Sequence, residues 1–160
     1  MTSTQTFDTY ARYREALLET LGRATQNIVI FDPDLRNTGL ESLEGIGALE
    51  SFCLRARVEE SLRIAVHSAS HIERDCPRLL NLVSRFGHRM QIRITSSAFR
   101  SLEQPFAIAD GVHLVSRFHP DNPRGKVCID DAQSSFALLS QFESLWAAAQ
   151  RGPSGIPLGI

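Results

Sequence analysis

Three helical patterns alternate with three short apolar runs over the first 94 residues of this chain. The apolar runs have the length of strands and lie at Ile28–Phe31, Leu62–Val66 and Met90–Ile94. Apolar residues at helical spacing precede each run, at about Phe7–Leu21, Leu40–Arg57 and Cys76–Phe86. An alternation of this kind predicts parallel strands that are joined by right-handed helical crossovers.

A different pattern follows, because Asp110-Gly111 lies between two short apolar segments. An Asp-Gly pair reverses the backbone at little steric cost, so residues 103–117 should form a hairpin of antiparallel strands. Another strand is expected at Lys126–Ile129, and a final helix should begin at Asp130-Asp131. The buried face of that helix is predicted to contain Phe136, Leu139, Phe142, Leu145, Trp146 and Ala149. The expected fold is therefore α/β, with a mixed sheet flanked by helices on both faces in a single domain.

The length of 160 residues and the mass of 17.8 kDa suit one domain. We expect a disordered N-terminus at residues 1–6, the α/β domain at 7–150, and a flexible Gly- and Pro-rich tail at 151–160. Cys53 and Cys128 lie in apolar patterns that favour buried thiols. The polar opening residues do not resemble a signal peptide, and no apolar run is long enough to span a bilayer, so a cytoplasmic location is expected.

The formal net charge is −1, which predicts no general attraction for nucleic acid or for an anionic membrane. Lys126 is the only lysine, so nearly all positive charge comes from arginine. Arginine can bind phosphate in a bidentate manner, but the codon bias of a GC-rich genome explains the preference more simply. We therefore expect nucleic-acid binding to be unlikely.

The hairpin segment resembles the active-site motif of the phospholipase D-like family, which is His-x-Lys-x4-Asp followed by a Gly-Ser pair. Aligning Asp110 with the motif aspartate puts Glu103 at the nucleophilic histidine and Pro105 at the phosphate-binding lysine. Arg117 and Phe118 then replace the Gly-Ser pair. The chain is similar to a degenerate bacterial member of this family that lacks the catalytic His-x-Lys pair.

The resemblance covers about residues 7–149, including a Phe-x-x-x-Trp pattern at Phe142 and Trp146 of the final helix. It implies a phospholipase D-like fold but not the family's reaction, in which a histidine attacks phosphorus and a lysine stabilises the developing charge. Glu103 would repel an anionic substrate, and Pro105 offers no donor. We therefore expect a pseudoenzyme without a cofactor that acts by binding or assembly. Single-motif relatives commonly form two-fold dimers across the site face, so a homodimer through that face is implied as well.

Polar residues also follow the predicted strands at their carboxyl ends, where α/β sheets commonly bind ligands. Asp32 and Asp34 follow the first strand, His67 and His71 follow the second, and His119 follows the hairpin. Two carboxylates near two imidazoles could bind a small ligand or a metal, or support acid–base catalysis. The same residues are typical of solvated loops and turns, and no metal-site motif is present. This rim therefore supplies the alternative hypothesis, a small-ligand or metal-binding enzyme or sensor.

Overall fold

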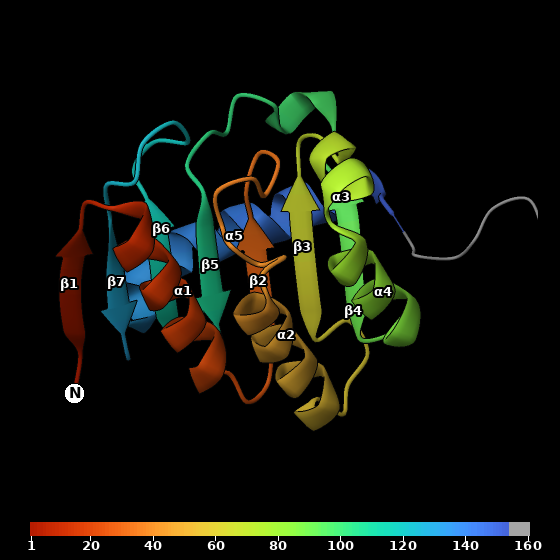
Figure 1. The fold of residues 1–160 in the computed structure, drawn as a ribbon. Helices are drawn as coiled ribbons and strands as arrows, with labels where there is room; N and C mark the ends of the chain where they lie inside the picture. The colour runs from red at the N-terminus through yellow and green to blue at the C-terminus, as the bar shows by residue number, and fades with distance from the viewer. Residues whose placement is uncertain (154–160) are drawn as a thin grey trace, which may run out of the picture.

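A mixed eight-stranded sheet forms the centre of the protein in the computed structural model, which describes residues 1–153 (Figure 1). The strand order across the sheet is β1-β7-β6-β5-β2-β3-β4-β8. The pairs β2–β3 and β3–β4 are parallel, and the other pairs are antiparallel. The strands are β1 (Ser3–Phe7), β2 (Ile28–Phe31), β3 (Leu62–Val66), β4 (Met90–Ile94), β5 (Phe106–Ala109), β6 (His113–Arg117), β7 (Gly125–Ile129) and β8 (Gln150–Arg151).

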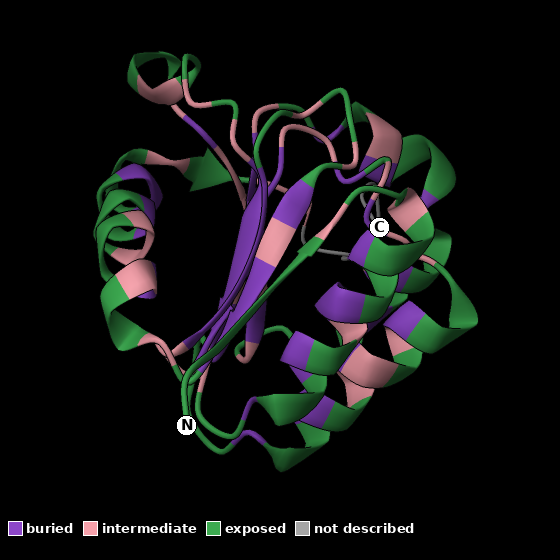
Figure 2. Ribbon diagram, turned by 90° about the vertical axis from the view of Figure 1, so that its left-hand side faces the viewer, coloured by how far each residue is buried: buried purple, intermediate pink, exposed green. Residues whose placement is uncertain are grey.

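Helices cover both faces of this sheet, which confirms the predicted fold class (Figure 2). The helices are α1 (Tyr10–Arg23), α2 (Leu43–Arg55), α3 (Ser70–Asp75), α4 (Pro77–Arg85) and α5 (Ala132–Ala148), with a 3-10 turn at Ser97–Phe99. One apolar core lies between the sheet and the first four helices, and it includes Leu17, Leu49 and Leu82. A smaller core lies under α5 and includes Phe142, Leu145 and Trp146.

The N-terminus differs from the sequence expectation, because residues 3–7 form a strand where a disordered segment was predicted. β1 pairs with β7 in a continuous antiparallel register from Ser3↔Ile129 to Phe7↔Gly125. The residues of β1 are largely exposed, so the segment lacks the apolar alternation by which strands are recognised. Its pairing with β7, whose residues lie 118 to 126 positions further along the chain, supplies the order, and Thr4 adds a hydrogen bond to the Cys128 sulfur.

The helices differ from the prediction in two details. The expected third helix is α4, where Pro77 occupies the first turn and its missing N–H costs nothing, but the short helix α3 just before it was not predicted. Phe136 is 70% exposed, although it was expected to be buried. The buried stripe of α5 runs instead through Ser135, Phe142, Leu145 and Trp146, and Phe136 lies beside that stripe.

At the C-terminus, Arg151 belongs to β8, which pairs with β4, so the predicted flexible tail does not begin at residue 151. Residues 154–160 of that predicted tail lie outside the described part of the chain. The three cysteines are buried and unbonded, as expected for Cys53 and Cys128. Within residues 1–153, no helix is long and apolar enough to cross a membrane.

Candidate functional site

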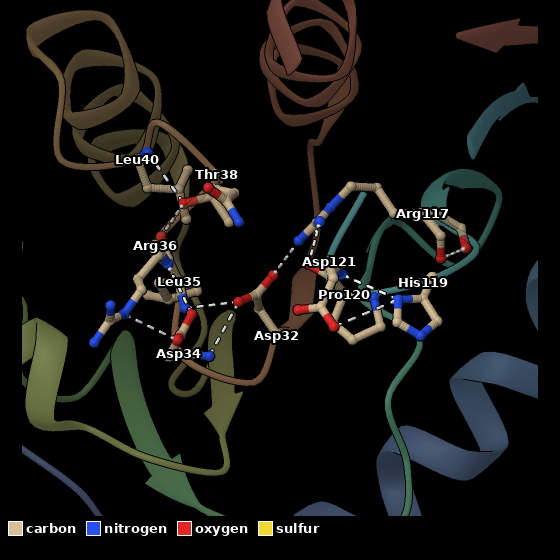
Figure 3. Close-up of polar contacts among 12 residues, drawn as sticks. Asp32, Asp34, Leu35, Arg36, Thr38, Leu40, Arg117, His119, Pro120 and Asp121 are labelled. Atoms are coloured by element: carbon tan, nitrogen blue, oxygen red, sulfur yellow. Dashed lines mark hydrogen bonds and ion pairs between the residues drawn. The ribbon is translucent and has the colours of Figure 1, made fainter. Parts of the chain in front are cut away.

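The centre of the candidate site is an ion pair between Asp32, which follows β2, and Arg117, the last residue of β6 (Figure 3). Arg117 Nη2 lies 3.1 Å from Asp32 Oδ1, and the two side chains are only 1% and 2% exposed. The Arg117 guanidinium also donates to the backbone carbonyls of Pro120 and Asn122. The antiparallel arrangement of β2, β5 and β6 brings these residues together from positions 85 apart in the sequence.

An aromatic wall from α1 closes the other side of the Arg117 guanidinium. Its central carbon lies 4.9 Å from the ring centroid of Tyr13 and 5.8 Å from that of Tyr10. A cation over an aromatic face is stabilised by the ring quadrupole. Burial also raises the pKa of the Tyr13 hydroxyl, so this phenol stays neutral. Arg117 Nε is buried and has no hydrogen-bond partner among the described residues, so the ring faces replace a polar contact.

The carboxylate of Asp32 is held by its backbone as well as by Arg117. Asp32 Oδ2 accepts hydrogen bonds from the N–H groups of Asp34 and Leu35. Burial raises the pKa of Asp32, while these two N–H groups and the Arg117 guanidinium act in the opposite direction. Arginine does not lose its proton in proteins, so the buried guanidinium needs the ionised carboxylate as its counterion. Asp32 therefore has a structural role, as the counterion of Arg117 and as the acceptor for two backbone N–H groups.

His67, which follows β3, is also satisfied by neighbouring residues. Its Nδ1 atom lies 2.6 Å from the Thr95 hydroxyl, and its Nε2 atom lies 2.6 Å from the Leu102 carbonyl oxygen. A carbonyl only accepts hydrogen bonds, so Nε2 carries the hydrogen. The ring packs edge-on against Phe31, with centroids 5.1 Å apart. Both ring nitrogens are therefore occupied in holding the loops after β3 and β4.

The structure does not unite the predicted rim into one cluster. Asp34 pairs with Arg36, His71 pairs with Asp75, and His119 lies near Asp121 in the loop after β6. No group of three or more His, Cys, Asp or Glu side chains within residues 1–153 is placed to hold a metal ion. Of the five predicted rim residues, only Asp32 contacts a degenerate motif position, which is Arg117.

The segment predicted to be a degenerate motif begins at the same end of the sheet, immediately before β5. Glu103 is exposed, whereas Pro105 is buried and its carbonyl accepts from the N–H of Arg117. Proline is tolerated at the start of a strand, because no ladder hydrogen bond from its nitrogen is required there. Next to it, Gln104 donates to the buried Ser116 hydroxyl at 2.7 Å. The motif strand therefore begins with contacts that join β5 to β6.

Asp110, at the other end of the motif strand, has a structural role beyond its turn. Its carboxylate accepts hydrogen bonds from the backbone N–H groups of Thr25, Gln26 and Asn27. Burial raises the pKa of Asp110, but these hydrogen bonds outweigh that effect, and the pKa is lowered overall. Asp110 thus fixes the connection between α1 and β2 and stays ionised. His113 in β6 is likewise structural, since its Nδ1 atom accepts from the N–H of Asp130.

A hollow of about 820 Å³ lies beside the loop that connects β6 to β7. Its lining includes Phe7 from β1 and Phe118, Asn122, Pro123 and Arg124 from the loop. Phe118 is 53% exposed and lines this hollow. The sequence analysis named Phe118 only as a residue that replaces the Gly-Ser pair, and it did not predict that this side chain would be exposed here.

The mixed sheet with helices on both faces matches the fold of solved phospholipase D family members. A family model described as "Domain of unknown function (DUF7931)" matches residues 9–154, and the chain belongs to this family. No curated protein sequence matches the chain.

Solved structures support the same fold. Nuc from Salmonella typhimurium, described as a phospholipase D family member, has a TM-score of 0.66 and 15% identity over 96% of this chain and 100% of its own. NucT from Helicobacter pylori has a TM-score of 0.56 and 10% identity over 95% of this chain and 100% of its own. At these identities the similarity establishes the fold alone.

TrmBL2, described as an archaeal chromatin protein with a novel mode of DNA binding, has a TM-score of 0.67 and 15% identity. The match covers 93% of this chain, and this chain spans only 54% of TrmBL2. The DNA binding belongs to that protein, and it runs against our expectation from net charge. For the present chain, the expectation that nucleic acid is not bound stays a prediction.

Proposed function

We propose that this chain is a phospholipase D-like domain that has no phosphodiesterase activity and acts by binding or assembly. The observation that carries the proposal is the buried Asp32–Arg117 ion pair at the candidate site, together with Glu103 and Pro105 at the motif's catalytic positions. Family chemistry needs a nucleophile and a donor that stabilises the phosphoryl oxygens. Neither aligned residue can supply the donor, since Glu103 is anionic and Pro105 has no N–H.

His67 does not compensate for the missing nucleophile. Both ring nitrogens of His67 are engaged, with Thr95 and with the Leu102 carbonyl. The two terminal nitrogens of the Arg117 guanidinium are also engaged, by Asp32 and by two backbone carbonyls, so they are not available to bind a phosphate in a bidentate manner. These contacts favour a structural use of the edge over the alternative of an enzyme or sensor built on the predicted rim.

We place the binding surface on the loop between β6 and β7 and the hollow beside it. The hollow has the size of a small-molecule site, and Phe118 and Arg124 offer an exposed ring and an exposed cation there. An exposed aromatic residue beside an arginine is typical of the residues that carry binding energy at protein interfaces. A homodimer through this site face, which the family resemblance implies, is one form that such binding could take.

The absence of phosphodiesterase chemistry is tested with bis(p-nitrophenyl) phosphate as substrate. We expect the wild-type protein to release p-nitrophenol no faster than buffer. The double replacement Glu103→His with Pro105→Lys should also remain inactive, because it leaves Arg117 and Asp32 in the site. Turnover by the purified wild-type protein that disappears in a Glu103→Gln variant would refute this part of the proposal.

Binding is tested by thermal shift with nucleotides, phosphorylated metabolites, phospholipid headgroups and divalent metals. A ligand at 100 times its dissociation constant should stabilise the fold by about 2.7 kcal/mol, which corresponds to several degrees. The proposal predicts that a shift is lost in Phe118→Ala or Arg124→Ala and kept in Asp34→Ala. A shift that is lost in Asp34→Ala or His71→Ala instead would support the rim hypothesis.

A further inference from the structure

We propose that a second copy of this chain pairs with the outer edge of β1, which joins two sheets across a two-fold axis at Gln5. This inference does not rest on the proposed function, although Phe7 of β1 also lines the hollow beside the binding loop. β1 is the terminal strand of the eight-stranded sheet, and within residues 1–153 it pairs only with β7 (Figure 1). A terminal strand leaves a row of backbone N–H and C=O groups facing outward, and another strand can satisfy these groups.

The two ends of the sheet are protected very differently. At one end, β8 has only two residues and pairs with the last two residues of β4 through Arg93↔Arg151 and Ile94↔Gln150, which places arginines there. Short length and positive charge are devices by which proteins prevent edge-to-edge pairing. β1 has five residues, Ser-Thr-Gln-Thr-Phe, and contains neither a charge nor a proline. Its pairing with β7 is unbroken from residue 3 to residue 7, so no bulge twists the edge away.

The side chains of β1 are also compatible with their own copy. In an antiparallel pair centred on Gln5, residue Ser3 faces Phe7 of the second copy, Thr4 faces Thr6, and Gln5 faces Gln5. A charged residue on the axis would face its own like charge, and β1 has none there. One position further out, Thr2 would face Asp8, so the extended register also brings no like charges together. Thr–Thr pairs and aromatic residues at opposite positions stabilise antiparallel strands.

The outer edge of β1 is accessible to a second strand. Ser3, Thr4, Gln5 and Thr6 are all exposed, and no other strand of the described chain lies beyond β1 in the sheet (Figure 1). Phe7 packs over Gly125 of β7, which holds β1 in place as a rigid template. The second copy is the occupant that satisfies the two-fold register, because each strand then acts as template and as partner.

The axial position of Gln5 permits a charge-swap experiment on the whole chain. We expect light scattering to show wild-type protein changing from 17.8 kDa to twice that mass as concentration rises. Gln5→Lys alone and Gln5→Glu alone should each raise the dimer dissociation constant by about 1.5- to 5-fold, because like charges then lie directly opposite each other. An equimolar mixture of the two variants should recover the dimer, since opposite charges then meet at the axis.

Gln133→Lys provides the matched control, because Gln133 is an exposed glutamine on α5 and its replacement should leave the dimer constant unchanged. Hydrogen exchange gives a second readout: amide exchange in residues 3–7 should slow as wild-type concentration rises, but not in Gln5→Lys. A wild-type protein that remains monomeric at all concentrations would overturn the inference. So would a dimer that is insensitive to both Gln5 variants and dissociates with Phe118→Glu, which would assign the contact to the site face.

Discussion

Replacement of Arg117 by methionine provides a direct test of the buried ion pair. Methionine has a flexible side chain that can remain packed against Tyr13, so the main loss is the positive charge beside Asp32. Both partners are almost completely buried, and water cannot replace the lost contact. Breaking a buried pair by removing one partner typically costs about 3–5 kcal/mol. For a domain of this size, that cost corresponds to a fall in the melting temperature of about 10 °C.

Urea unfolding followed by tryptophan fluorescence can measure this cost. Trp146 is the only tryptophan, and it packs under the Arg93 guanidinium at 4.3 Å, so its emission should change on unfolding. The matched control is Arg23→Met, which removes an exposed pair with Glu19 and should cost less than about 1 kcal/mol. Adding Asp32→Asn to Arg117→Met should recover part of the loss, because the amide leaves no uncompensated charge.

The pH dependence of the Arg117→Met variant separates electrostatics from packing. Burial already raises the pKa of Asp32, and loss of the guanidinium should raise it further. A carboxyl whose folded pKa exceeds its unfolded pKa favours the folded state when protonated, so the deficit should be full at neutral pH and shrink as pH falls through the folded pKa. A deficit below about 1 kcal/mol at neutral pH, or one that stays constant into mildly acidic solution, would refute the argument.

Three further outcomes test other parts of the structure. Asp110→Ala removes the acceptor for the N–H groups that follow α1 and should lower the free energy of unfolding in urea by about 2 kcal/mol. Because the pKa of Asp110 is lowered in the folded protein, this difference from wild type should shrink as pH falls through the folded pKa. Gly125→Ala would place Cβ against the Ser116 carbonyl oxygen and should lower the free energy of unfolding by about 3 kcal/mol. Gly22→Ala in α1 would place Cβ where nothing lies within 4 Å, and it should raise the free energy of unfolding by up to about 1 kcal/mol. Duplex DNA should not retard the wild-type protein in a gel at low salt. A retarded band would show that the net charge of −1 is a wrong basis for excluding nucleic-acid binding.

The parts of the fold that could be predicted are those that a few consecutive residues indicate by their own composition. β2 and β3 are runs of four and five residues, and nearly every residue in them is buried, so their apolar composition marks them directly. Asp110-Gly111 marked the hairpin because both residues adopt positive φ, at 56° and 71°, and aspartate and glycine tolerate this conformation. β1 escaped prediction because its order comes from pairing with β7, and no local pattern records a pairing partner far along the chain.

The candidate site was predictable only in part for the same reason. The strand-end rule placed Asp32 and His67 at one edge of the sheet, and the structure places both there beside the loops that follow β2 and β3. The rule cannot indicate which polar side chain will form hydrogen bonds or an ion pair with a neighbouring residue and so be unavailable to a ligand. Arg117 lies 85 positions from Asp32, and its partner depends on the order in which β2, β5 and β6 associate.

Asp110 shows why the retention of a motif residue is poor grounds for inferring the motif's chemistry. The chain keeps an aspartate at this position while replacing the residues aligned with the histidine, the lysine and the Gly-Ser pair. The structure gives a reason: Asp110 binds three consecutive backbone N–H groups, and its contacts lie at the opposite end of β5 from Glu103 and Pro105. Removing its carboxylate would leave donors of the α1–β2 connection unsatisfied, whatever the domain binds. Selection for folding alone would therefore preserve Asp110, whether or not the domain carries out the family's reaction.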